Sequence, residues 1–136
     1  MSSSHQPRGQ RWAVAEVADI LVGERKLISV DGREIGVFNV GGTFVSILNV
    51  CPHALAPVCL GRVSGTTVPS GPGEYRWGRE GEILACPWHG WEFDLRTGRA
   101  LTNANLHLRI YPTEVENGTI FVYLPRRYRE MDDDTT

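Results

Sequence analysis

The chain has 136 residues, which suits one domain and is too short for two independent hydrophobic cores. Its 14 basic and 16 acidic residues give a net charge of -2, which argues against nucleic acid as a partner. The apolar stretches are too short to cross a bilayer, and the polar first ten residues lack a signal-peptide core. Three cysteines, an odd number, argue against a disulfide framework. We therefore expect a soluble, cytoplasmic protein of a reducing compartment that binds no membrane.

Short β-rich segments separated by glycine and proline predict an all-β sandwich or barrel. The dipeptides Asp31-Gly32 and Asn117-Gly118 favour tight hairpin turns, because their residues tolerate positive φ. Between the first of these hairpins and the strand that follows, Gly41-Gly42 predicts another turn. Residues 16–24 offer one possible helical turn. Strands are expected at residues 26–30, 33–40, 43–48, 106–110, 113–116 and 119–123.

The predicted domain covers residues 11–127, between a flexible start (1–10) and a polar, acidic tail (128–136). Within it, residues 64–81 form a long excursion rich in Gly, Ser and Pro. Such a long loop in a compact domain is usually functional or mobile. Its second half is expected to form a small hairpin, with residues 75–77 paired with 82–84.

Two short motifs carry the chemistry of this chain. Cys51-Pro52-His53 and Cys86-Pro87-Trp88-His89 each place one cysteine close to one histidine, and 32 residues separate the two motifs. Thiolate and imidazole ligands suit zinc or iron–sulfur chemistry. Either pair alone could be a buried thiol beside a surface histidine, but two such pairs together predict a metal site.

The division of ligands between the loops bears on which metal binds. Four such ligands could hold one tetrahedral zinc, but zinc knuckles usually pair two cysteines in one loop. One cysteine and one histidine from each loop suits two irons, with Cys51 and Cys86 on one iron and His53 and His89 on the other. Replacement of two thiolates by two imidazoles on one iron defines a Rieske centre. A structural zinc domain remains the alternative at this point.

At these motifs the sequence resembles the Rieske 2Fe–2S family, in particular the bacterial oxygenase-type Rieske ferredoxins. Residues 51–61 (CPHALAPVCLG) resemble the first cluster loop of that family, and residues 86–98 (CPWHGWEFDLRTG) resemble the second. The family's order of strands and loops is followed over residues 12–125. The resemblance implies a small antiparallel β-sandwich with one 2Fe–2S cluster at its tip, between the two cluster-binding loops.

The resemblance also implies one-electron transfer from a flavin-dependent reductase to a terminal ring-hydroxylating or related oxygenase, or to another oxidoreductase. The charges agree with that role, because two ferric ions, two sulfides and two thiolates sum to zero and one electron makes the core singly negative. Oxygen activation by this chain alone is not expected, since it would need a second iron site with two histidines and a carboxylate. Beyond the motifs only His5 and His107 remain. A small subunit or regulatory Rieske module, like that of nitrite reductases, is the other alternative.

Several positions depart from the pattern of respiratory Rieske proteins. Ala56 and Trp88 occupy the positions of their extra disulfide, and Trp91 and Phe93 those of a serine and a tyrosine that donate hydrogen bonds to the cluster. Without those hydrogen bonds the reduced state is less stable, so we expect a reduction potential in the lower part of the range of roughly −150 to +300 mV.

The remaining expectations concern single residues. Leu55 stands where many relatives have glycine, so a backbone with positive φ would be strained there. Its side chain could shield the cluster. Cys59 is expected to be a buried thiol, His107 a solvent-facing strand residue, and Trp88 with Trp91 to pack around the cluster loop.

Overall fold

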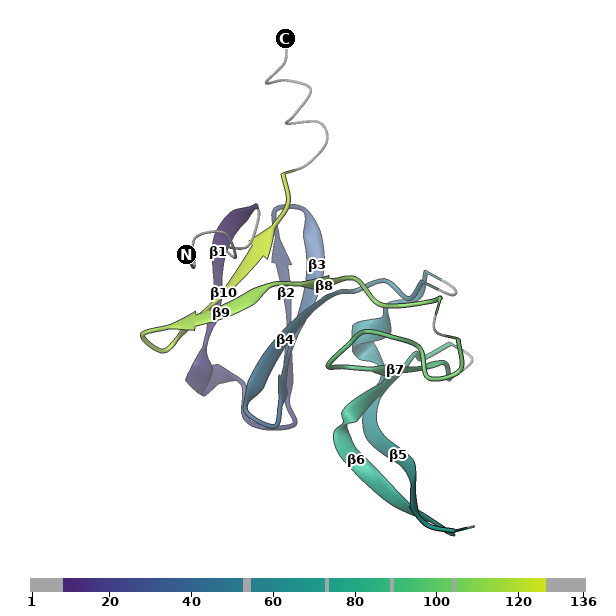
Figure 1. Ribbon diagram of the computed structural model, residues 1–136. Helices are drawn as coiled ribbons and strands as arrows, with labels where there is room; N and C mark the ends of the chain where they lie inside the picture. The colour runs from purple at the N-terminus through teal and green to yellow at the C-terminus, as the bar shows by residue number, and fades with distance from the viewer. Residues whose placement is uncertain (1–8, 53–54, 73, 89, 104, 127–136) are drawn as a thin grey trace, which may run out of the picture.

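The computed structural model of this chain describes residues 9–52, 55–72, 74–88, 90–103 and 105–126, and every structural statement below refers to them. Their fold is nearly all-β, with antiparallel pairing in three small sheets (Figure 1). This confirms the predicted β-sandwich. Most of the predicted flexible ends, residues 1–8 and 128–136, lie outside the described residues.

The first two sheets form the body of the sandwich. One has the order β1-β10-β9, with bounds Gln10–Glu16, Thr119–Leu124 and Thr113–Glu116. The other has the order β2-β3-β4-β8, with bounds Arg25–Val30, Arg33–Val40, Thr43–Leu48 and Ile110–Tyr111. A short 3₁₀ helix at Val17–Asp19 leads out of β1, inside the segment for which one helical turn was predicted.

Local turn signals in the sequence set the hairpins of this body. Asp31 and Gly32 both have positive φ, 52° and 74°, as do Asn117 and Gly118, 52° and 81°. These are the conformations that join antiparallel strands with the right-handed twist. The predicted bounds of β2, β3, β4, β9 and β10 are therefore correct to within one residue. The strand predicted at residues 106–110 is shorter, because β8 contains only Ile110–Tyr111 and His107 makes an isolated bridge to Arg99.

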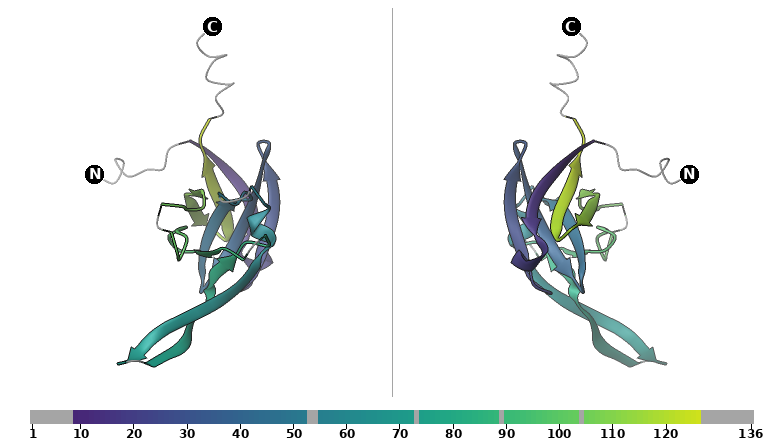
Figure 2. Two further views of the ribbon diagram at one scale, coloured as in Figure 1. Left: turned by 90° about the vertical axis from the view of Figure 1, so that its right-hand side faces the viewer. Right: turned by 90° about the vertical axis from the view of Figure 1, so that its left-hand side faces the viewer.

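The third sheet extends away from the body. Its order is β5-β6-β7, with bounds Arg62–Gly71, Glu74–Ala85 and Glu92–Asp94, and the 3₁₀ helix Val58–Leu60 precedes it. The predicted small hairpin inside the 64–81 excursion is wrong. Tyr75 and Trp77 pair with Pro69 and Thr67 of β5, so the excursion is one long two-stranded hairpin. In Figures 1 and 2 this hairpin projects from the sandwich as a twisted ribbon.

The central sheet β2-β3-β4-β8 has a hydrophobic cluster on each side. Successive residues of a strand point to opposite faces. Val37 accordingly packs into the cluster formed with β1 and β10, whereas Phe38 packs into a second cluster that contains Cys51 and Cys86. Val45 and Ile47 of β4 also belong to the second cluster. The two clusters lie on opposite faces of this one sheet, so they belong to one domain. We call the cluster shared with β1 and β10 the sheet half, and the cluster that contains Cys51 and Cys86 the cysteine half.

No described helix is long and apolar enough to cross a membrane.

Candidate metal centre

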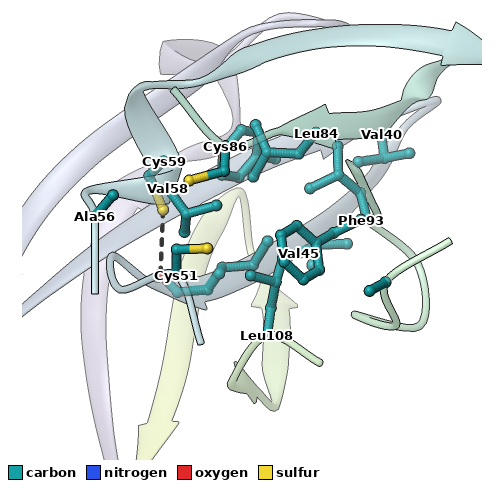
Figure 3. Packing of buried hydrophobic residues seen from close by; sticks show 14 residues of the cluster. Val40, Val45, Cys51, Ala56, Val58, Cys59, Leu84, Cys86, Phe93 and Leu108 are labelled. Atoms are coloured by element: carbon teal, nitrogen blue, oxygen red, sulfur yellow. Dashed lines mark hydrogen bonds between the residues drawn. The ribbon is translucent and has the colours of Figure 1, made fainter. Parts of the chain in front are cut away.

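Two thiols meet in the cysteine half. Cys51 follows β4 and Cys86 follows β6, and their exposed fractions are 0% and 2%. Both are free thiols, and they contact each other closely enough to raise the pKa of Cys86. Figure 3 shows the two sulfur atoms among apolar side chains that include Phe93 and Val58. Residues 35 positions apart in the sequence thus present sulfur ligands at one buried point.

Backbone hydrogen bonds close each cysteine-bearing loop. The Cys51 N–H donates to the Ala56 carbonyl at 2.8 Å, and the Leu55 N–H donates to the Cys51 carbonyl at 2.7 Å. In the other loop the Cys86 N–H donates to the Trp91 carbonyl at 2.7 Å. Each loop is therefore a compact turn that folds back on its own cysteine, which holds the sulfur in a fixed position.

The electrostatic surroundings of Cys86 suit a metal ligand. Burial raises the pKa of the Cys86 thiol, a hydrogen bond from the Trp88 backbone N–H opposes this, and contact with Cys51 raises the pKa further. The Cys86 thiol therefore favours its protonated form. A metal ion that takes the place of the thiol proton removes this penalty, and such binding is coupled to proton release.

The histidines of the two motifs, His53 and His89, lie outside the described residues. Their ring positions relative to the thiols are therefore left open, and no third Cys, His or carboxylate joins Cys51 and Cys86 among the residues that are described. The chemistry of the donor set nonetheless fits an iron–sulfur group, because two adjacent buried thiols supply the soft ligands that such clusters need.

Leu55 has the strained backbone that the sequence indicated. Its φ is +57°, in the left-handed region that leucine rarely adopts. Its side chain is 78% exposed, and whether it shields the cluster stays a prediction. Trp91 packs against the cysteine half as expected, but Trp88 is 54% exposed and does not.

A set of contacts that sequence reasoning missed supports the first loop. The guanidinium of Arg25 on β2 donates to the carbonyl oxygens of Cys59, at 2.6 Å, and of Gly61. The Cys59 N–H donates to the Asn49 side chain at 2.8 Å. These bonds attach the 3₁₀ helix after the first loop to the central sheet. No local sequence pattern marks Arg25, because its partners lie 34 and 36 residues away.

Cys59 completes this support as a buried thiol, as predicted. Its exposed fraction is 0%, and burial raises its pKa to about 12. A Cβ atom added at Gly36 of β3 would lie 2.6 Å from the Cys59 sulfur, so only glycine leaves room for it. A glycine in the interior of β3 is the sequence signal for this close approach. His107 is exposed, as expected.

An ion-pair network lies at the base of the long hairpin. Arg79 pairs with Glu82 and Asp94, and Arg96 pairs with Glu82 at 3.6 Å. Arg79 lies in an irregular part of β6 and has a φ of +56°. Arg79 and Arg96 thus connect β6 to the turn after β7.

Two loops that each present a buried thiol at one side of an antiparallel sandwich form a site that suits an iron–sulfur group. Comparison with known families agrees, since the Rieske [2Fe-2S] domain matches residues 10–112. The chain belongs to this family, and its cofactor is one Rieske-type 2Fe–2S cluster. A structural zinc domain is thereby set aside.

Individual relatives narrow the class. The chain is 30% identical to the ferredoxin component of the naphthalene 1,2-dioxygenase system of Pseudomonas putida, over 84% of this chain and 96% of that protein. The ferredoxin of carbazole 1,9a-dioxygenase from Nocardioides aromaticivorans IC177 has 27% identity and a TM-score of 0.67, over 87% of this chain and all of that one. A chain of the complex of reduced oxygenase and oxidized ferredoxin in carbazole 1,9a-dioxygenase has a TM-score of 0.68 at 20% identity, over 88% of this chain and 98% of that one. This similarity shows that the two chains share a fold.

Proposed function

We propose that this chain is the Rieske ferredoxin component of an oxygenase system, which passes one electron at a time to a terminal oxygenase. The observation that carries this proposal is the contact of two buried, free thiols from separate loops in a Rieske sandwich. The similarity to dioxygenase ferredoxins over nearly their whole length supports the oxygenase as acceptor. A flavin-dependent reductase is the electron donor in this proposal.

The proposal assigns a ligand to each of four side chains. Cys51 and Cys86 hold one iron, and His53 and His89 hold the other. The bound cluster supplies a reversible one-electron couple. The protein excludes water around the sulfur ligands, because Cys51 and Cys86 are almost completely buried. The backbone hydrogen bonds that close both loops hold the two sulfurs in place.

The ligand assignment is tested by His89→Cys, with His107→Cys as the matched control. Iron and sulfide content, visible absorption and the electron paramagnetic resonance spectrum of the reduced protein are measured. We expect His89→Cys to lose the absorption and the g-values of a mixed-ligand cluster, because an imidazole ligand has been replaced. His107→Cys is expected to retain both, since His107 is exposed on another segment. An unchanged spectrum in His89→Cys would contradict the assignment.

The role as a carrier has its own test. We expect protein-film voltammetry to give a potential in the lower part of the Rieske range of roughly −150 to +300 mV, because Trp91 and Phe93 carry no hydroxyl group. We also expect the isolated, reduced holoprotein to lose one electron per cluster to an external acceptor and to oxygenate no aromatic substrate. Robust oxygen turnover by this chain alone would overturn the carrier role.

A further inference from the structure

A cation of the central sheet reaches the cysteine half. Arg25 of β2 lies directly opposite Phe38 of β3, and residues paired in this way share one face of the sheet. Phe38 is 2% exposed and belongs to the hydrophobic cluster of Cys51 and Cys86. The guanidinium carbon of Arg25 lies 5.4 Å from the centre of the Phe38 ring, which is within the range of a cation–π contact. The positive charge of Arg25 therefore faces the cysteine half.

Backbone carbonyls hold this guanidinium at the point where the two cysteine-bearing loops meet. Nη1 of Arg25 donates to the carbonyl oxygens of Cys59, at 2.6 Å, and of Gly61, just after the first loop. Gly61 also approaches the second loop. A Cβ atom added there would lie 1.8 Å from the carbonyl oxygen of Ala85, the residue before Cys86. A single side chain thus anchors the segment between both loops.

Arg25 differs from two other arginines that bind backbone carbonyls. Arg33 and Arg96 also donate to carbonyl oxygens, but each of them pairs with a carboxylate as well. Within the described part of the chain, no carboxylate forms an ion pair with Arg25. The positive charge of Arg25 is therefore not neutralised by a carboxylate of the described residues, and it acts on its surroundings in full.

The field of this charge reaches a buried sulfur atom. Burial raises the pKa of the Cys59 thiol to about 12, and the charge of Arg25 opposes this rise more strongly than Glu34 adds to it. Cys59 packs in the same cluster as Cys51 and Cys86, and Figure 3 shows the three cysteine side chains together. Charges interact strongly in such an interior, because water is excluded from it.

The two loops supply no fixed charge of their own. Residues 50–61 and 83–91 contain no Asp, Glu, Lys or Arg, although 22% of the whole chain is charged. Net charge is one of the quantities that set the reduction potential of an iron–sulfur cluster. Because reduction adds a negative charge, a cation beside the loops that has no counter-ion favours the reduced state.

We propose that Arg25 is a positioning residue of the cluster site, which anchors the segment between the two cysteine-bearing loops and raises the reduction potential by its positive charge. This inference rests on the proposed function and adds a residue that sets the driving force for electron transfer. Arg25 acts on the stability of the reduced state and not on the set of ligands. The spectrum of the cluster therefore stays that of wild type when Arg25 is replaced.

The test compares the holoproteins of wild type and three variants at one pH and one ionic strength. Arg25→Gln removes the charge, whereas Arg25→Lys keeps a charge on a shorter side chain. The matched control is Arg33→Gln, because Arg33 is also half-buried but donates to the carbonyl of Pro125, beyond the end of β10. Protein-film voltammetry measures the reduction potential, and electron paramagnetic resonance of the reduced protein measures the g-values.

We expect Arg25→Gln to lower the equilibrium constant for uptake of one electron roughly tenfold, which corresponds to a fall in potential of about 59 mV. Arg25→Lys should change this constant by less than about threefold, and Arg33→Gln by less than about twofold. The g-values should equal those of wild type in all three variants. An unchanged potential in Arg25→Gln, or an equal fall in either of the other two variants, would overturn the proposal.

Hydrogen exchange measures the anchoring without use of the redox reaction. The N–H groups of Leu60 and Gly61 donate to carbonyl oxygens within the turn that Arg25 holds, at 3.0 and 2.9 Å. We expect both amides to exchange at least about tenfold faster in Arg25→Gln than in wild type, and the amide of Val122 in the sheet half to exchange at an unchanged rate. Unchanged exchange at Leu60 and Gly61 would refute the anchoring role.

A substitution at a neighbouring position tests the charge even if Arg25→Gln assembles no cluster. Leu27 is 44% exposed and lies two residues along β2, on the same face as Arg25. Leu27→Glu therefore places a negative charge beside the guanidinium and leaves its carbonyl partners in place, and Leu27→Gln is the uncharged control. We expect the constant for electron uptake to fall about threefold in Leu27→Glu and to stay unchanged in Leu27→Gln. Equal potentials in these two variants contradict the proposal, whereas a wild type without a cluster spectrum refutes the proposed function itself.

Discussion

The two sides of the central sheet are built by different means. On the sheet half, Ile35 and Val37 of β3 pack in one hydrophobic cluster with Ile120 and Val122 of β10, and hydrogen-bonded strands of two sheets hold these residues in place. On the cysteine half most of the covering chain is loop, and its position depends on single contacts such as those from Arg25. Strand pairing and apolar burial are enough to form the sheet half. The cysteine half also contains close approaches and hydrogen bonds between side chains and backbone, and it holds the two buried thiols.

The largest expected difference between the halves follows from loss of the cluster. We expect Cys86→Ser to abolish iron binding and to unfold the cysteine half locally, because metal binding and folding are coupled. Hydrogen exchange checks this by residue. The amides of Leu95 and Ala100, which donate to carbonyls within that half, should lose protection. The amides of Ile120 and Val122, in the sheet half, should keep their protection from exchange. Uniform loss of protection would show that the two halves fold as one unit.

A second prediction compares steric crowding in one half with torsional strain in the other. A Cβ atom added at Gly61 would lie 1.8 Å from the Ala85 carbonyl oxygen, which is backbone and cannot move away. We expect Gly61→Ala to lower the free energy of unfolding by about 3 kcal/mol. Gly42 has open space around it but a φ of +98°, so Gly42→Ala should cost about 1 kcal/mol. Urea titration of both holoproteins measures the difference, and equal costs would contradict the crowding at Gly61.

The sequence predicts the two halves unequally well. The hairpin turns of the sheet half are local, so Asp31-Gly32 and Asn117-Gly118 were sufficient to place the strands that flank them. The cysteine half depends on contacts between distant segments. The motif at Cys86 predicts a metal site, but nothing local in the sequence indicates that Arg25 binds two carbonyls beyond the first loop.

The long hairpin shows why the remaining error arose. The pattern of residues 75–84 suggested a tight local turn, yet β6 continues through this region with an irregular stretch at Arg79. That stretch is determined by ion pairs to Glu82 and Asp94, and the second of these lies 15 residues along the chain. Periodicity within one segment carries no information about such a partner.

A third prediction isolates the contact between the central sheet and the first loop. Gly36→Ala places a methyl group against the Cys59 sulfur, and we expect a loss of about 2 kcal/mol. Cys59→Ala alone leaves a small cavity and should cost about 1 kcal/mol. Because the second change removes the atom that the first one meets, the double variant should be more stable than the sum of the two losses indicates. Thermal or urea unfolding of wild type, the two single variants and the double variant gives the coupling free energy between the two positions. Simple additivity would mean that these residues do not constrain each other.

The smallest expected effect concerns Asp94 at the base of the hairpin. Burial alone would raise the pKa of this carboxyl group, but hydrogen bonds from Arg79 and from the Arg96 backbone N–H prevail and lower it. A carboxyl group whose pKa is lower in the folded state stabilises the fold at pH values above its pKa in the unfolded state, which is about 3.9. This contribution to stability is lost as the pH falls through the pKa of the folded state.

Asp94→Asn keeps an acceptor for the Arg96 N–H but removes the charge. We therefore expect it to be about 1 kcal/mol less stable than wild type at pH 7, with a difference that narrows below about pH 4. Glu114 on β9 is exposed and pairs with Arg11 at 3.5 Å, so Glu114→Gln is the matched change on the sheet half and should cost less at every pH. Urea unfolding between pH 3 and pH 7 measures both. A gap between wild type and Asp94→Asn that stays constant down to pH 3 would show that the charge of Asp94 does not connect the hairpin to the turn after β7.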